Sequence, residues 1–249
     1  MAPYVAEFIG TALLVIFGNG VVANVVLSRT KGHGGGWIVI TAGWALGVFV
    51  GVFSSQEFSG AHLNPAVTLA MAASGEFAWS SVGAYLLAQM LGGVVGGASV
   101  FLFYREHFKA TDDPAAKLAC FSTTPNIRSI PQAFFCEVMG TFLLVLPIFL
   151  MTDAKIHMPG AVAGSEPLKV GLGTLGAVPV ALLVFAIGLS LGGTTGYAIN
   201  PARDLGPRLA HALLPIPGKG SSDWAYAWVP VLGPVVGGLA AAGIQAVLL

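Results

Sequence analysis

Long apolar runs alternate with polar connections along almost the whole chain. Six runs of about 20 residues stand out, at about 4–27, 37–55, 81–104, 131–151, 172–192 and 226–248. A helix of about 20 apolar residues spans the roughly 30 Å hydrocarbon core of a bilayer. The pattern therefore predicts six membrane-spanning helices, with the longest connections at 105–130 and 152–171.

Two shorter segments, at about 64–75 and 200–213, do not fit this pattern. Each would form a helix of roughly 10–13 residues, about 15–20 Å long at 1.5 Å per residue. Such a helix reaches through half of a bilayer. We therefore expect two half-helices in addition to the six spans.

The composition agrees with a membrane environment. The chain has 249 residues, of which 55% are hydrophobic and 9% charged, with a mean hydropathy of +0.82. Soluble domains carry about 25% charged residues. The net charge is zero and no long basic run suggests nucleic acid, while Cys120 and Cys136 do not suggest a disulfide framework. Since the N-terminus lacks a basic n-region and a small-residue cleavage site, we expect the first run to be a retained span.

The sequence contains an internal repeat. "AEFIGTALLV" at 6–15 resembles "CEVMGTFLLV" at 136–145, "SGAHLNPAVTLA" at 59–70 resembles "TGYAINPARDLG" at 195–206, and "YLLAQMLGGVVGG" at 85–97 resembles "YAWVPVLGPVVGG" at 226–238. Each half holds three spans, an odd number, so the second half enters the membrane from the opposite side. We expect one transmembrane domain over 1–249, with repeat one at about 1–110, repeat two at about 131–249 and a linking loop at 111–130. Sites in inverted repeats lie near the midplane, where the halves meet.

The half-helices carry matching start signals, and their residues are those that begin a helix. An Asn at the N-cap accepts hydrogen bonds from first-turn amides, and Pro at the first helical position has no amide to satisfy. The two signals are Asn64-Pro65-Ala66 and Asn200-Pro201-Ala202. With inverted halves, these N-termini meet at the membrane centre, each with about half a positive charge. The preceding segments, Gly60-Ala61-His62 and Gly196-Tyr197-Ala198, are expected to be extended and to line a water-filled path with their carbonyls.

These motifs and the repeat resemble the aquaporin family over almost the whole chain, and within it the aquaglyceroporin, or bacterial glycerol facilitator, branch. The resemblance implies an all-α membrane fold of six tilted helices and two half-helices around one pore. It also implies a homotetramer in the cell membrane and no cofactor or metal. The chain's repeated small-residue spacing suits close helix packing. The absence of N-glycosylation sequons and long tails favours a bacterial inner membrane.

The resemblance also places a selectivity filter, by spacing, on Trp44, Gly188, Tyr197 and Arg203. Water-selective relatives resemble one another in carrying His at the position of Gly188 and a small residue at that of Tyr197. Here glycine makes room, the two aromatic rings suit a carbon backbone, and the guanidinium offers several donors to hydroxyls. This combination favours a polyol. Tyr197 stands where the bacterial glycerol facilitator more usually has Phe. The pattern therefore indicates the class of solute more firmly than the order of preference among solutes.

Other polar residues have simpler interpretations. Arg203 would donate to solute oxygens and repel cations, although pairing with Asp204 or a lipid headgroup is the alternative. The resemblance implies that Glu7 and Glu137, at the head of each repeat, accept hydrogen bonds from the loops before the half-helices, and titration during a proton-coupled transport cycle is the alternative. Asp204 is expected to stabilise the first turn of its helix, with Arg208 four residues on. A pH-sensing role for His62 is a minor alternative to a bracing role.

The predicted function is a passive channel for glycerol and other small neutral solutes, which also passes water and excludes ions and protons. Alternatives are a pore for urea, dihydroxyacetone or undissociated lactic acid, and an ion-coupled secondary transporter. No metal-ligand cluster, phosphate loop or nucleophile–base pair predicts an enzyme.

Two features disagree with the family pattern. The resemblance implies that both termini lie inside the cell. The inner loops then hold only Lys155 and Lys169, whereas eight cations lie in outer segments, against the positive-inside rule. Thr124 stands where glycerol-type relatives often carry an aromatic residue. That difference concerns the outer vestibule more than the filter.

Overall fold

The computed structural model describes residues 1–152, 154–156 and 168–248, and it confirms the predicted membrane fold. Six of its helices are long and apolar enough to cross a bilayer. They are α1 (Pro3–Val26), α2 (Trp37–Ser59), α4 (Trp79–Phe103), α7 (Ile130–Leu150), α8 (Val178–Ser190) together with the 3-10 turn η1 (Gly173–Ala177), and α10 (Val229–Leu248). The fifth span thus begins as a 3-10 helix, which the hydropathy pattern alone does not reveal.

The two half-helices lie between the spans. They are α3 (Pro65–Ala73) and α9 (Pro201–Leu213). Asn64 caps α3 by accepting from the Ala66 amide, and Asn200 caps α9 by accepting from the amides of Ala202 and Arg203. Both half-helices pack against α4 and α10. The half-helices therefore begin inside the bundle, surrounded by spans.

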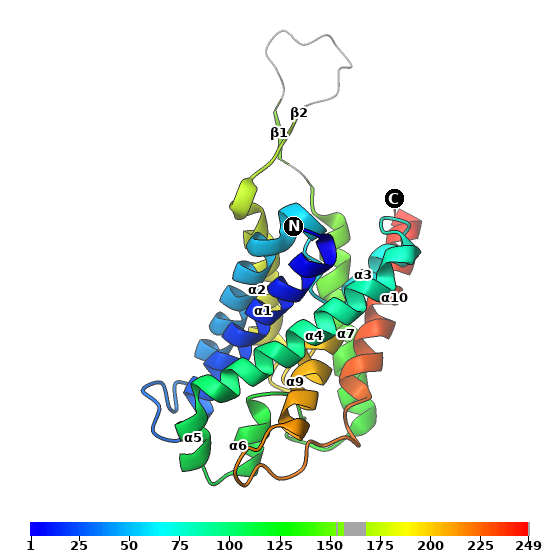
Figure 1. Ribbon diagram of the computed structural model, residues 1–249. Coiled ribbons are helices and arrows are strands. Elements are labelled where there is room, and N and C mark those ends of the chain that lie inside the picture. The colour runs from blue at the N-terminus through cyan, green and yellow to red at the C-terminus, as the bar shows by residue number, and fades with distance from the viewer. Residues whose placement is uncertain (153, 157–167, 249) are drawn as a thin grey trace, which may run out of the picture.

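The two ends of the bundle differ. Both termini lie at one end, from which the hairpin of β1 (Ala154–Ile156) and β2 (Leu168–Val170) also projects (Figure 1). We call this the terminal end. The opposite end, the loop end, carries two short helices, α5 (Arg105–Ala110) and α6 (Pro114–Ala119), beside the connection between α1 and α2 (Figure 1). The hairpin occupies part of the connection at 152–171, for which the sequence predicted no strand.

Apolar and polar side chains are distributed as expected for a protein in lipid. Large apolar residues on the spans point outward, among them Leu46, Leu102 and Phe103, which is 83% exposed. Charged Glu7 and Glu137 are fully buried. Ionisable side chains inside a membrane protein normally face the bundle interior or a water-filled cavity. The polar interior therefore marks the place of a site.

Several of the cations at the loop end are engaged in contacts within the protein. Lys117 donates to the carbonyl of Pro217, and Lys219 donates to three carbonyls at the end of α9, at 2.6–2.7 Å. Arg208 is buried against Asp204, and Arg128 pairs with Asp223. With Lys109, which pairs with Glu106 at 3.8 Å, five of the eight cations counted against the positive-inside rule have structural partners. Of the other four, Arg128 and Arg208 are paired with carboxylates, whereas Lys117 and Lys219 keep their charge against neutral carbonyls.

Candidate functional site

The segments before the half-helices are irregular, but they are not extended as the sequence analysis expected. In the first, Gly60, Ala61 and Leu63 have φ values of 78°, 52° and 50°, in the left-handed region. In the second, Gly196, Tyr197 and Ile199 have the same pattern, at 86°, 39° and 44°. A non-glycine residue in this region costs about 1–3 kcal/mol and persists only where the surroundings hold it. The left-handed residues turn the backbone, which a straight strand would not do.

Glu7 holds the first segment from one side. Its Oε1 accepts from the His62 amide at 2.9 Å and from the Ser59 hydroxyl at 2.7 Å. Its Oε2 accepts from the Leu63 amide and from Gln89 Nε2, each at 2.7 Å. Because the amides of the segment turn toward this carboxylate, the backbone carbonyls are left free to face elsewhere.

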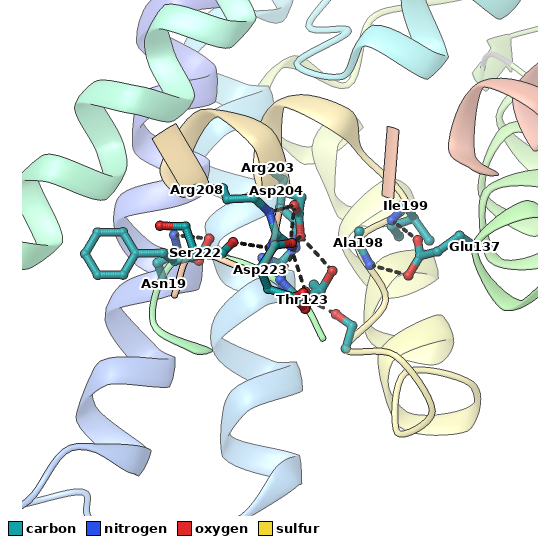
Figure 2. Close-up of polar contacts among 12 residues, drawn as sticks. Asn19, Thr123, Glu137, Ala198, Ile199, Arg203, Asp204, Arg208, Ser222 and Asp223 are labelled. Carbon is teal, nitrogen blue, oxygen red and sulfur yellow. Dashed lines mark hydrogen bonds and ion pairs between the residues drawn. The ribbon is translucent and has the colours of Figure 1, made fainter. Parts of the chain in front are cut away.

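Glu137 makes the matching contacts in the second segment (Figure 2). Its Oε1 accepts from the Ala198 amide at 3.0 Å and from the Thr195 hydroxyl at 2.7 Å, and its Oε2 accepts from the Ile199 amide at 2.8 Å. Hydrogen bonds to an ionised acceptor contribute about 1.5–3 kcal/mol each. Two buried carboxylates therefore offset the cost of the left-handed residues.

The two capping asparagines also link the halves. Asn64 Nδ2 donates to the Ile199 carbonyl, and Asn200 Nδ2 donates to the Leu63 carbonyl, each at 2.8 Å. An amide group has two N–H donors. One donor of each side chain is thus used in this crossing, and a second remains on each. The spacing of the motifs did not reveal the crossing, because it depends on how the halves face each other.

Two cavities meet inside the bundle. One, of about 260 Å³, extends toward the terminal end, and the other, of about 190 Å³, extends toward the loop end. Asn64, Asn200 and both irregular segments contribute residues to the terminal-end cavity. Only Trp44, Tyr197 and Arg203 line both cavities, within the part of the chain that the structure describes. These three side chains therefore form the boundary between the cavities, which we call the constriction.

The side chains of the constriction are packed tightly. The guanidinium carbon of Arg203 lies 3.8 Å from the centroid of the Trp44 ring, a cation–π distance, and Nη2 approaches the Gly196 carbonyl at 3.4 Å. A Cβ added at Gly18 would lie 2.1 Å from the Trp44 ring, so glycine is required there. Among the described residues, Arg203 has no other side-chain hydrogen bond, and Trp44 Nε1 has no partner. Several donors at the constriction are therefore free.

Gly188 takes a different place from the other three filter candidates. It lines neither cavity. A Cβ on it would lie 2.9 Å from Thr41 Cγ2 and 3.0 Å from Tyr197 Cζ and the phenol oxygen, so the Tyr197 ring fills the space beside it. Trp37 fixes this position further, because its Nε1 donates to the Gly188 carbonyl at 2.9 Å and its ring packs edge-on against Tyr197. Gly188 thus shapes the constriction by admitting the Tyr197 ring.

Asp204 and Arg208 form a buried ion pair beside the constriction (Figure 2). Arg208 Nε donates to Asp204 Oδ1 at 2.8 Å, and both side chains are fully buried. Asp204 Oδ2 also accepts from the amide and the hydroxyl of Thr123, each at 2.7 Å, and Arg208 Nη2 donates to the Thr123 carbonyl at 2.9 Å. Arg208 Nη1 donates to the Ser222 carbonyl at 2.8 Å. The pair therefore does more than stabilise a first turn, because it joins α9 to two loops.

Sequence reasoning missed several of these partners. Thr68 and Gln89 belong to the Glu7 network, and Thr195 belongs to that of Glu137. Thr195 and Ser59 hold equivalent places in the repeat, so the repeat itself could have identified them. Thr123 lies in the loop at 111–130, outside both repeats, and no motif singles it out.

The remaining predicted residues also have defined places. The ring of His62 packs against Phe77 and Tyr85, and its Nδ1 lies 3.1 Å from the Thr68 hydroxyl. Thr124 lines the loop-end cavity. No cluster of three or more His, Cys, Asp or Glu side chains suited to a metal occurs in residues 1–152, 154–156 and 168–248.

Six apolar spans, two capped half-helices and two cavities joined at a constriction define a multi-pass membrane channel. The family model of the major intrinsic proteins matches residues 1–245, and the chain belongs to that family, in its glycerol facilitator and aquaglyceroporin branch. Its relatives are channels, and the chain is not an enzyme.

Two relatives and one solved structure show the extent of the likeness. The probable glycerol uptake facilitator protein of Thermotoga maritima is 51% identical over 244 residues, covering 98% of each chain. The glycerol uptake facilitator protein of Bacillus subtilis is 52% identical over 238 residues, covering 96% of this chain and 81% of the relative. The aquaglyceroporin from Plasmodium falciparum is 31% identical, with a TM-score of 0.83, and the match covers 99% of this chain and 95% of that chain.

Proposed function

We propose that this protein conducts glycerol and other small neutral solutes passively, passes water and excludes ions and protons. The observation that carries the proposal is the pair of cavities that meet at Trp44, Tyr197 and Arg203. The solute path runs from the loop-end cavity through this constriction and past Asn64 and Asn200 to the terminal end. The names of the relatives support glycerol as the solute.

The chemistry of the constriction suits a polyol. Trp44 and Tyr197 present ring surfaces to CH groups, and Arg203 presents donors to hydroxyl oxygens. Beyond the constriction, the second N–H of each capping asparagine donates to the passing oxygen. The carbonyls of Gly60, Ala61, His62, Gly196, Tyr197 and Ala198 accept from its hydroxyls. A carbon chain with one hydroxyl per carbon can satisfy both sides at once.

Ion exclusion follows from the charges near the path. Two helix N-termini bring roughly half a positive charge each to the middle of the path, and Arg203 adds a full charge. Fixed positive charge in a narrow pore repels cations, and donors at the capping asparagines interrupt a proton-conducting chain of water. The sparse ionisable groups along the path support a channel over an ion-coupled transporter.

We further propose a single domain of two inverted halves, at about 1–110 and 131–249, that assembles as a homotetramer with its terminal end inside the cell. The matching networks of Glu7 and Glu137 support the two halves. The pairing of Arg128 and Arg208 with carboxylates lowers the net positive charge of the loop end, which weakens the charge argument against this orientation. Access of an external protease in intact cells to a tag at the C-terminus would contradict the orientation.

The test is solute flux in liposomes that contain the purified protein. After mixing with an inward glycerol gradient, light scattering should show fast reswelling, whereas sorbitol, which is larger, should give shrinkage alone. A panel of urea, dihydroxyacetone and lactic acid at low pH ranks the other solutes. Rapid water-driven shrinkage without glycerol reswelling would make this a water channel, and flux that requires an imposed proton or sodium gradient would make it a transporter.

A further inference from the structure

Gly196 connects two of the three side chains at the constriction. It precedes Tyr197 in the chain, and its carbonyl lies 3.4 Å from Arg203 Nη2. Its φ of 86° lies in the left-handed region, where only glycine is unstrained. Its amide donates to the Gly192 carbonyl at 2.9 Å, while the face where a side chain would stand is left for another residue to fill.

Thr123 is the residue that packs there. A Cβ added at Gly196 would lie 3.3 Å from Thr123 Cγ2 and 3.4 Å from Thr123 Cβ. The methyl group of Thr123 therefore lies against the open face of Gly196. Thr123 is itself 4% exposed and lines the loop-end cavity together with Gly196, Tyr197 and Arg203.

Thr123 is held firmly in this place. Its amide and hydroxyl both donate to Asp204, and its carbonyl accepts from Arg208 (Figure 2). Asp204 follows Arg203 directly on α9. The contacts therefore close a ring that runs from Arg203 to Gly196, to Thr123, to Asp204 and back to Arg203. Within this ring, the buried hydrogen bonds of Thr123 to Asp204 and Arg208 involve charged groups, which makes the place of Thr123 rigid.

The first half of the chain has no such support. Gly60 holds the place of Gly196 in the repeat and has a similar φ of 78°, but a Cβ on it would meet only His62 Nε2, at 4.0 Å. Two of the three constriction side chains, Tyr197 and Arg203, belong to the second half, whereas Trp44 belongs to the first. The support is thus present at the one irregular segment that carries a filter side chain.

We propose that Thr123 is a positioning residue for selectivity: its methyl group fixes Gly196 and thereby sets how closely Tyr197 and Arg203 approach across the constriction. The buried Asp204–Arg208 pair fixes Thr123 through its backbone. This inference rests on the proposed function, because it assigns to Thr123 control over the solutes that the proposed filter admits.

Two variants of Thr123 separate the roles of its side-chain groups. Thr123→Ser keeps the hydroxyl that donates to Asp204 and removes the methyl group against Gly196. Thr123→Val keeps the methyl group and removes the hydroxyl, while both backbone hydrogen bonds remain. Each purified full-length variant is reconstituted in liposomes, and the ratio of erythritol flux to glycerol flux is measured beside the thermal midpoint of unfolding.

We expect Thr123→Ser to raise the erythritol-to-glycerol ratio by roughly threefold, below the tenfold or more that a methylene change in direct contact with a substrate produces. Its thermal midpoint should stay close to that of the unmodified protein. Thr123→Val should change the ratio less than Thr123→Ser does and lower the midpoint more. This opposite pattern in the two readouts is not expected if Thr123 only stabilises the fold.

Three results would overturn the inference. An unchanged ratio in a stable Thr123→Ser protein that still passes glycerol would show that the methyl group does not control selectivity, and the proposed function would stand. Equal changes of the erythritol-to-glycerol flux ratio in Thr123→Ser and Thr123→Val would show that Thr123 acts only by stabilising the fold. An unmodified protein that passes no glycerol would remove the proposed function, and this inference with it.

Discussion

The two half-helices share one scaffold and differ in what they carry. Both begin at a capping asparagine, follow a segment with three left-handed residues, and are held by a buried glutamate. Yet α3 contains no charged residue, whereas α9 contains Arg203, Asp204 and Arg208. The repeat places Val67 where α9 has Arg203. The comparison indicates that the repeat builds both half-helices and their supports, while the charged residues of α9 have no counterpart in α3.

The difference also explains the placement of the constriction. Arg203 reaches the Trp44 ring from α9, while Asp204 and Arg208 join that helix to the loops that carry Thr123 and Ser222. A buried ion pair contributes less than its Coulomb energy because both charges lose their hydration. In this pair the carboxylate and the guanidinium also have backbone partners, which satisfy the remaining donors and acceptors. On α9, Arg203 therefore lies at the constriction, while Asp204 and Arg208 hold each other and the neighbouring loops.

The largest loss of stability should come from removing the buried glutamate that supports each half-helix. Glu7→Gln and Glu137→Gln each place an amide N–H against a backbone N–H, so we expect a loss on the order of 3 kcal/mol in each. The thermal midpoint of the purified protein, followed by tryptophan fluorescence, measures this loss. Glu57→Gln, at an exposed position in α2, provides a control for the loss of one negative charge. A strong loss in only one of the two variants would show that the halves are not supported equally.

Next comes the space that Gly188 provides for Tyr197. In the double variant Gly188→His with Tyr197→Ala, an imidazole side chain on α8 fills the space that the Tyr197 ring leaves. A polar side chain then replaces an aromatic ring at the constriction. Glycerol flux should fall about tenfold or more relative to water flux, in line with the cost of changing a discriminating pocket. Stopped-flow light scattering in liposomes measures both fluxes. An unchanged flux ratio would contradict the assignment of these two residues to the filter.

Arg203→Val removes the charge that distinguishes the two half-helices and makes the position equivalent to Val67. We expect cation or proton leakage to rise roughly tenfold, since about 1.4 kcal/mol less repulsion has that effect. A pH-sensitive dye inside the liposomes reports proton entry, and Arg203→Lys provides the charge-conserving control. If proton entry through the Arg203→Val protein is as slow as through the unmodified protein, the helix N-termini alone exclude protons.

The smallest effect concerns the loop end. The hydrogen bond and charge of Arg128 lower the pKa of Asp223 below its ordinary value. This pair should therefore stabilise the protein above the ordinary pKa, and the contribution should be lost as the pH falls through the lowered value. Because Arg128 is partly exposed, we expect less than about 1 kcal/mol. Comparison of thermal midpoints for the unmodified protein and Asp223→Asn at pH 7 and pH 3 measures it. A difference that grows toward pH 3 would contradict this sign.

The sequence predicted the fold well because lipid imposes a simple requirement on it. Each span needs about 20 apolar residues, and the bounds of the six predicted runs lie within a few residues of the six helices. The β1–β2 hairpin and the 3-10 start of the fifth span were not predicted, since neither alters the hydropathy of its segment. The left-handed residues before each half-helix were missed for a different reason: only glycine signals that conformation, and Ala61, Leu63, Tyr197 and Ile199 are not glycine.

For the candidate site, spacing brought together residues that lie far apart in the chain. Trp44, Tyr197 and Arg203 lie at the constriction, while Gly188 lies behind the Tyr197 ring. Spacing could not reveal the crossing of Asn64 and Asn200 or the contacts of Thr123. These depend on which faces meet after folding, and Thr123 has no partner in the repeat to mark it.

The most direct test of the account is a high-resolution structure of the protein in a bilayer equilibrated with glycerol. The account predicts a glycerol molecule between the two cavities, with its carbon chain against Trp44 and Tyr197 and its hydroxyls at Arg203. Glycerol bound elsewhere, with water alone between these three side chains, would contradict it.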